Sequence, residues 1–114
     1  MMIRLATVMD LSELYHMLYV MHSETSHNLS PIVSEKLTTA ISMSLHRGVV
    51  LVAEVDGHII GSIGGMETTD WWSDEKYLAD MWFFVYKEHR KSTAAIKLVK
   101  SFMQKTIVLE LQQI

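Results

Sequence analysis

Two apolar segments joined at Asp56-Gly57 constrain the fold of this chain more than any other feature of its sequence. Residues 49–55 (VVLVAEV) are rich in β-branched side chains, and residues 58–66 return as a second apolar run. Asp-Gly between two such runs is a strong signal for a two-residue turn, because both positions tolerate positive φ angles. We therefore predict an antiparallel hairpin. Gly64-Gly65, inside the second run, predicts a bulge or the close approach of another group.

Two helices are expected before this hairpin. Residues 3–8 alternate loosely and predict a short strand. Asp10 stands at the predicted N-cap of the first helix, and Glu13 three positions later completes a capping box. Apolar residues at helical spacing follow it. A second helix is expected over residues 34–46, ending at Gly48.

The C-terminal half predicts a strand, a helix and a final strand, over residues 77–86, 92–105 and 107–114. The first of these strands is too apolar for an exposed sheet edge. A strand–helix–strand unit pairs its strands in parallel through a right-handed crossover. The expected order is therefore β-α-α-β-β-β-α-β, an α/β fold with a mixed sheet and helices on both faces. A length of 114 residues suits a single domain over residues 1–114.

Composition excludes several classes of protein. The chain has no cysteine, so it has neither a disulfide framework nor a thiolate metal site. No apolar run approaches the roughly 20 residues that cross a bilayer. Arg4 and Asp10 interrupt the N-terminal segment before it can form the apolar centre of a signal peptide. These features predict a cytoplasmic protein that does not contact a membrane.

Positive charge is concentrated in one part of an acidic chain. The net charge is −3, yet residues 87–105 hold six lysine and arginine residues against one acidic residue, Glu88. The turn at residues 87–91 lies between the predicted strand and helix, where the first helix amides and the helix dipole favour an anion. Arg90 and Lys91 add two full charges, so a pyrophosphate suits this turn better than a single carboxylate. The alternative is a solvated basic helix face.

The residues around this turn resemble the acetyl-CoA motif of the GNAT N-acetyltransferase superfamily. That motif reads Val-x-Pro-x-x-Arg, followed by Arg/Gln-x-x-Gly-x-Gly/Ala. In the segment VYKEHRKSTAAIKLV, Val85 and Arg90 match, Lys87 replaces the proline, Thr93 stands at the first glycine position and Ala95 at the second. The resemblance covers nearly the whole chain in the order of its elements, but it is specific in residues only over the strand, the turn and the helix.

The resemblance implies an enzyme that moves an acetyl group from acetyl-CoA directly to a primary amine of a small molecule or a protein. Arg90 and Lys91 would lie near the phosphates. The strand residues whose backbone would hold the pantetheine arm are Phe83, Phe84 and Val85. The residues whose amides would hold the pyrophosphate are Lys91, Ser92, Thr93, Ala94 and Ala95. The acidic remainder of the chain favours a cationic acceptor.

The chain departs from the family in two ways. Thr93 replaces a glycine that lets phosphate approach closely, although its hydroxyl can itself donate a hydrogen bond. Family members continue with one more helix and two strands, which often carry a tyrosine that protonates the leaving thiolate. This sequence is then a fragment, a naturally short form, or a chain whose sheet is completed by a partner, such as a second copy in a homodimer.

Two carboxylates are candidates for the base that removes a proton from the amine. Asp80 lies on the fourth predicted strand, and its neighbours Ala79 and Met81 are expected to desolvate it partly and so strengthen it as a base. Glu67, at the end of the hairpin, is the second candidate. The alternative for each is an ordinary solvated strand carboxylate.

Four aromatic and histidine residues are candidates for contact with the acceptor. Trp71 and Trp72 lie in an acidic loop and either cover an amine or fold back onto the sheet. His22 and His27 border the expected entrance between the first two helices and either contact the acceptor or lie on the plain surface. No histidine pair has the spacing of a helical zinc site, and HExxH is absent, so no metal is expected.

Two other functions are compatible with the sequence. The first is a catalytically weak or inactive module of the same fold that binds CoA or another protein, as Thr93 and the early chain end suggest. The second is a nucleic-acid-binding domain that uses the Lys91–Lys105 helix. It is disfavoured because such a groove needs a wider basic surface.

Overall fold

The computed structural model describes residues 1–25 and 30–113 of the chain. The N-terminal part forms strand β1 (Met2–Leu5), the 3-10 turn η1 (Val8–Asp10) and helices α1 (Leu11–Glu24) and α2 (Ser34–Arg47). Three strands follow: β2 (Gly48–Val55), β3 (His58–Thr69) and β4 (Lys76–Val85). The 3-10 turn η2 (Lys87–His89) and helix α3 (Ala94–Gln112) complete the described chain.

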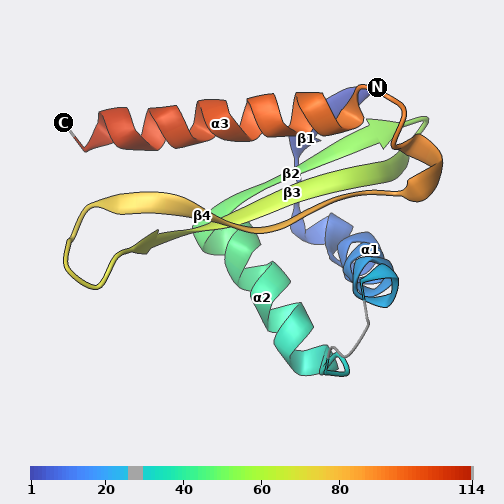
Figure 1. The fold of residues 1–114 in the computed structure, drawn as a ribbon, viewed down its shortest axis with the longest axis horizontal. Helices are drawn as coiled ribbons and strands as arrows, with labels where there is room; N and C mark the ends of the chain where they lie inside the picture. The colour runs from blue at the N-terminus through green and yellow to red at the C-terminus, as the bar shows by residue number, and fades with distance from the viewer. Residues whose placement is uncertain (26–29, 114) are drawn as a thin grey trace.

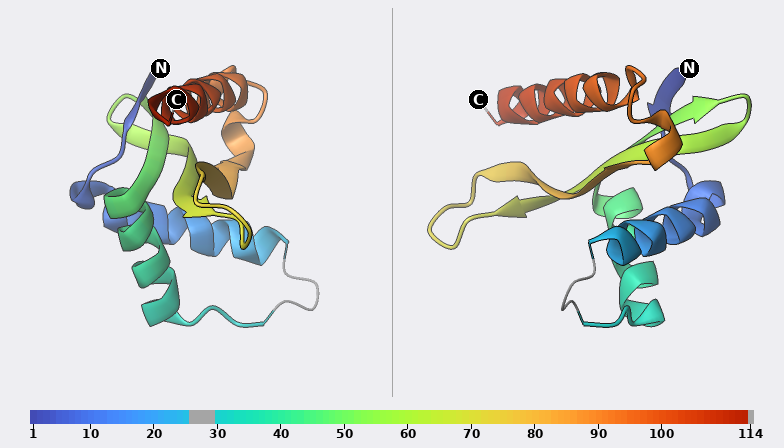
Figure 2. Two further views of the ribbon diagram at one scale, coloured as in Figure 1. Left: turned by 90° about the vertical axis from the view of Figure 1, so that its left-hand side faces the viewer. Right: turned by 45° about the vertical axis from the view of Figure 1, so that its right-hand side comes forward.

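The four strands form one antiparallel sheet in the order β1-β2-β3-β4. Helices α1 and α2 cover one face, and α3 crosses the other (Figures 1 and 2). The prediction of an α/β fold with helices on both faces is confirmed. None of the helices in the described residues has both the length and the apolar character to span a membrane.

The hairpin and the bulge predicted from the sequence are both present. Asp56 and Gly57 have φ angles of 51° and 79°, which give the tight turn between β2 and β3. The register between β3 and β4 shifts at Gly64 and Gly65. A Cβ atom on Gly64 would lie 2.2 Å from the Trp82 ring, and a Cβ atom on Gly65 would lie 2.5 Å from Cζ of Phe102. Each glycine therefore gives room for an aromatic ring.

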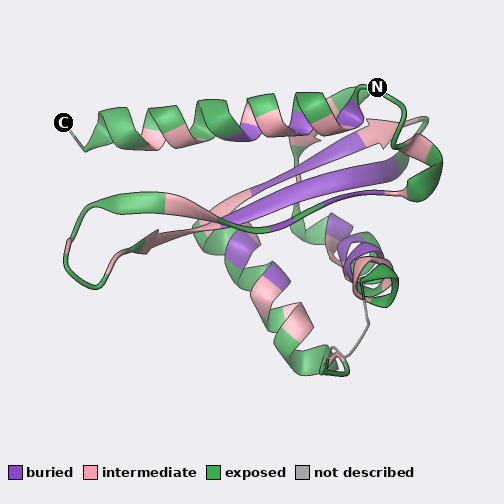
Figure 3. Cartoon of the chain, in the orientation of Figure 1, coloured by how far each residue is buried: buried purple, intermediate pink, exposed green. Residues whose placement is uncertain are grey.

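The core has two parts, one on each face of the sheet (Figure 3). The part under α1 and α2 includes Leu14, Met17, Ile41, Val52, Trp82 and Phe84. The part under α3 includes Leu51, Ala53, Ile63, Val85, Leu98 and Phe102. Burial of these side chains supplies most of the driving force that fixes the helices on the sheet.

The predicted final strand over residues 107–114 is wrong. Residues 107–112 instead continue α3, which also begins two residues later than predicted. The end of the helix is fixed by Gln113, whose side-chain amide donates to the Lys76 carbonyl oxygen at 2.7 Å and accepts from the Lys76 amide. The expected parallel pairing is therefore absent among the described strands. β4 is an edge strand, contrary to the prediction, with Met81 50% and Phe83 45% exposed.

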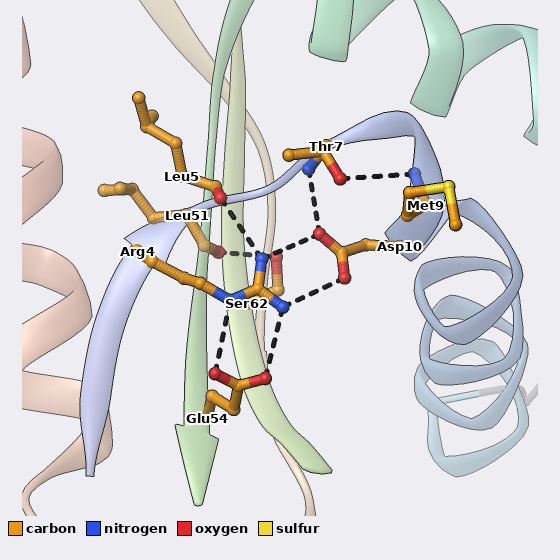
Figure 4. A network of polar contacts seen from close by, with 8 residues as sticks. All are labelled: Arg4, Leu5, Thr7, Met9, Asp10, Leu51, Glu54 and Ser62. Atoms are coloured by element: carbon orange, nitrogen blue, oxygen red, sulfur yellow. Dashed lines mark hydrogen bonds and ion pairs between the residues drawn. The ribbon is translucent and has the colours of Figure 1, made fainter. Parts of the chain in front are cut away.

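The N-terminus also differs from its prediction. β1 ends at Leu5, and the capping box joins Thr7 to Asp10 on η1 instead of Asp10 to Glu13. The Asp10 carboxylate accepts from the Thr7 amide at 2.8 Å and pairs with Arg4 at 2.8 and 3.0 Å (Figure 4). Arg4 also donates to Glu54 on β2 at 3.3 Å. This network fastens the start of α1 to the sheet.

Asp10→Asn should reduce the dependence of stability on pH. The hydrogen bonds from Arg4 lower the pKa of Asp10 below its ordinary value of about 4. The stabilisation is therefore complete above the unfolded pKa and is lost as the pH falls through the folded pKa. We expect Asp10→Asn to lower the free energy of unfolding by about 1–3 kcal/mol at pH 7, and by less near pH 2.

Urea denaturation between about pH 7 and pH 2 checks this prediction. The exposed Asp74, which has no polar partner in the described residues, provides the matched control Asp74→Asn. Equal pH profiles for Asp10→Asn and the unmodified protein would contradict it.

Ser62→Ala should destabilise the fold. Ser62 is fully buried, accepts from Nε1 of Trp82 at 3.0 Å and donates to the Leu51 carbonyl oxygen at 2.8 Å. The substitution leaves the indole N–H buried without a partner, at a cost of about 1–3 kcal/mol. Thermal or urea denaturation measures the loss. The exposed helical Ser42→Ala should show no such loss, and an equal effect in both variants would refute this role.

Candidate functional site

The basic turn connects the end of β4 to the start of α3. Ser92 organises it: the Ser92 amide and hydroxyl both donate to the His89 carbonyl oxygen, at 3.0 and 2.6 Å, and the hydroxyl accepts from the Ala94 amide at 3.3 Å. Thr93 is the N-cap residue, and its side chain makes no capping hydrogen bond. The other first-turn amides of this 19-residue helix have no partner within the helix, so they are available to an anion.

Arg90 turns back into the protein instead of outward. Its Nε donates to the Val85 carbonyl oxygen at 2.9 Å, its Nη2 pairs with Glu24 at 2.6 Å, and its guanidinium lies 5.1 Å from the centre of the Phe84 ring. Arg90 therefore ties together the end of β4, the basic turn and the last turn of α1. Lys91 is exposed and pairs with no acidic group in the described residues, so its charge is available.

The edge of β4 leads directly to this turn. Phe83 is partly exposed there, while Phe84 and Val85 are buried on opposite faces of the sheet. Because β4 pairs with β3 alone among the described strands, the backbone groups that point away from β3 are available to an extended ligand. The predicted strand and turn residues of the cofactor site are therefore contiguous.

The two candidate carboxylates lie on the face of the sheet that α3 covers. Asp80 is opposite Gly65 in the register, and Glu67 is opposite Leu78. Asp80 is exposed and has no polar partner in the described residues, so the partial desolvation expected from its neighbours is absent. Glu67 is engaged by the Lys76 ammonium group at 3.2 Å. Asp80 is the freer of the two carboxylates.

The bulge produces a groove that sequence reasoning missed. Met81 is the extra residue of β4 between the partners of Gly64 and Gly65. Met81, Met43 of α2 and Met66 of β3 all line a groove of about 460 Å³. Met43 lies at the surface, with 36% of its area exposed. The Gly64-Gly65 pair was the one signal that could have located this groove.

The two tryptophans lie away from the basic turn. They occupy the connection between β3 and β4, at the opposite end of the sheet from the start of α3 (Figure 1). Trp71 is 92% and Trp72 66% exposed, with their rings edge to face at 5.2 Å. They do not fold back into the core. The structure does not bring them together with Arg90 or Lys91.

The structure describes one of the two candidate histidines. His22, in the last turn of α1, donates from Nε2 to the Ser30 carbonyl oxygen at 2.8 Å. His27 lies outside the described residues. Over residues 1–25 and 30–113, no three His, Cys, Asp or Glu side chains gather in a group that could hold a metal ion.

Comparison with known proteins gives structural neighbours only. No family model and no curated protein matches the sequence. A protein from Clostridium difficile 630 described as a possible acetyltransferase has a TM-score of 0.74 and 21% identity, covering 90% of this chain and 68% of its own. An acetyltransferase from Vibrio fischeri gives 0.72 and 27%, covering 92% and 85%. A GNAT family acetyltransferase from Staphylococcus aureus gives 0.68 and 17%, covering 96% and 79%.

Proposed function

The chain has the fold of GNAT N-acetyltransferases, and we propose that it transfers an acetyl group from acetyl-CoA to a primary amine. The observation that carries the proposal is the continuity of the β4 edge, the basic turn and the unpaired amides of α3. An extended arm followed by a pyrophosphate, as in acetyl-CoA, fits those three parts in that order. They support acetyl-CoA as the cosubstrate, and no metal takes part in the proposal.

The residues of the turn have distinct roles in this proposal. Of residues 91–95, the Ser92 and Ala94 amides are already engaged within the turn. The amides of Lys91, Thr93 and Ala95 and the Lys91 ammonium group therefore hold the pyrophosphate, and the unengaged Thr93 hydroxyl donates to it. Arg90 acts through the turn, since its guanidinium is already shared between Val85 and Glu24. The backbone of Phe83, Phe84 and Val85 lies beside the pantetheine arm.

The reaction needs a base and an amine positioned to attack the thioester. The amine nitrogen bonds to the thioester carbonyl carbon, the carbon–sulfur bond breaks, and CoA leaves as its thiol. Asp80 accepts the proton that the nitrogen loses, directly or through water, while the thiolate takes a proton from solvent. Most of the rate enhancement then comes from holding the two reactants in place. Glu67 contributes less because Lys76 occupies it.

A second candidate is a module of the same fold without turnover, which binds CoA or another protein. The observation that favours it is the β4 edge, where Met81 and Phe83 are exposed and backbone groups are unpaired. Such an edge is an association surface, and a second copy of the chain in a homodimer is the simplest partner. Thr93 at a position that is usually glycine points the same way.

Lys91→Glu should weaken CoA binding. The substitution places a negative charge beside the proposed pyrophosphate site, and we expect the dissociation constant to rise at least tenfold, or about 1.4 kcal/mol. Isothermal titration of CoA into each protein measures this change. Lys100→Glu makes the same charge change nine residues further along the chain, within α3, and should leave affinity nearly unchanged. Absence of binding at about 1 mM CoA in the unmodified protein would refute the cofactor site.

Asp80→Asn should slow transfer without weakening CoA binding. A positioned base contributes about 10²–10⁴ to the rate, so kcat should fall by at least tenfold. The measurement is release of free thiol from acetyl-CoA with an amine acceptor present. Glu67→Gln is the matched control and should retain most of the activity. If Glu67→Gln is the more damaging substitution, Glu67 is the base and Asp80 is not.

A further inference from the structure

The groove between α2 and the bulge of β4 fits the body of the acceptor. We infer that it takes a primary monoamine whose amine is attached to an aromatic or branched apolar group. This inference rests on the proposed acetyl transfer, and it names the class of acceptor for that reaction.

Three methionines give the groove its chemistry. Met43 from α2, Met66 from β3 and Met81 from β4 line it, together with Thr39 and Ala40 of α2. Thioether side chains are flexible and polarisable, and they make favourable contacts with aromatic rings. At about 460 Å³ the groove is large enough for a single ring with a short side chain. Such a surface recognises shape and apolar area, not a pattern of hydroxyl groups.

The charges that line the groove do not favour a polycation. Glu35 and Lys36 both line it, so its net charge is zero. A polyamine or an aminoglycoside would bring several charges to a surface that offers one carboxylate and one ammonium group. A monoamine bound by its uncharged body avoids that cost, because its one charged end projects out of the methionine-lined part.

The bulge places this groove next to the candidate base. Met81 and Trp82 both point to the face that α1 and α2 cover, since Met81 lines the groove beside α2 and Trp82 belongs to the core on that side. Asp80 is opposite Gly65, whose missing side chain would touch Phe102 of α3, so Asp80 points to the other face. In this arrangement Met81 contacts the body of the acceptor on the α2 side of the strand edge. Its neighbour Asp80 accepts the proton on the α3 side.

Methyl NMR of protein labelled with ¹³C at the methionine methyl groups tests the groove directly. The probe is 2-phenylethylamine, with spermidine as the polycationic comparison, both added in the presence of CoA. We expect the methyl signals of Met43, Met66 and Met81 to move with 2-phenylethylamine at millimolar concentration, and not with spermidine. The signal of Met103, exposed on the outer side of α3, should stay in place. Single Met→Leu substitutions assign the signals.

A pair of charge-introducing variants gives a second readout. Met81→Glu should raise KM for 2-phenylethylamine at least tenfold while CoA affinity is unchanged, and Met103→Glu should alter neither. Unmoved groove methyls, or equal shifts with spermidine, would overturn the inference even if acetyl transfer is observed with another amine. Movement of the groove methyl signals without acetylation of 2-phenylethylamine would overturn the acceptor assignment. Absence of CoA binding to the unmodified protein would instead reject the proposed function.

Discussion

The close packing of two aromatic rings against two consecutive glycines is the constraint on which the rest of the structure depends. Neighbouring strand residues face opposite sides of a sheet, so Gly64 receives the ring of Trp82 and Gly65 the ring of Phe102. The first contact closes the core under α1 and α2, and the second fixes the distance of α3 from the sheet. A side chain at either position would push one layer away from β3.

The same glycines shape the candidate site. The register shift beside them inserts Met81 into β4 as an extra residue and turns it toward α2, while Asp80 remains on the side of α3. The far end of β4 is fixed differently, by the hydrogen bond from Arg90 to the Val85 carbonyl oxygen and the ion pair between Arg90 and Glu24. Packing thus positions the bulge at one end of the site, and the hydrogen bonds of Arg90 position the basic turn at the other.

Local features of this fold could be predicted from the sequence, and features that depend on distant partners could not. The turn at Asp56-Gly57 needs only residues that tolerate positive φ. Residues 107–112 begin with the β-branched pair Ile107-Val108, yet they are helical, because α3 is already packed on the sheet and Gln113 bonds to Lys76. The inward direction of Arg90 depends on Glu24, 66 residues away, and no local pattern shows it.

The distance in sequence between Arg90 and Glu24 affects how the chain folds. The turn and α1 are joined across 66 residues, so the turn is complete only when both parts of the chain have folded together. A partly folded chain would hold the hairpin without an ordered turn. Any ligand of the turn would then bind the finished molecule alone and shift the folding equilibrium toward it in proportion to concentration. The ligand would therefore protect folded chains from proteolysis, while partly folded chains stay susceptible to it.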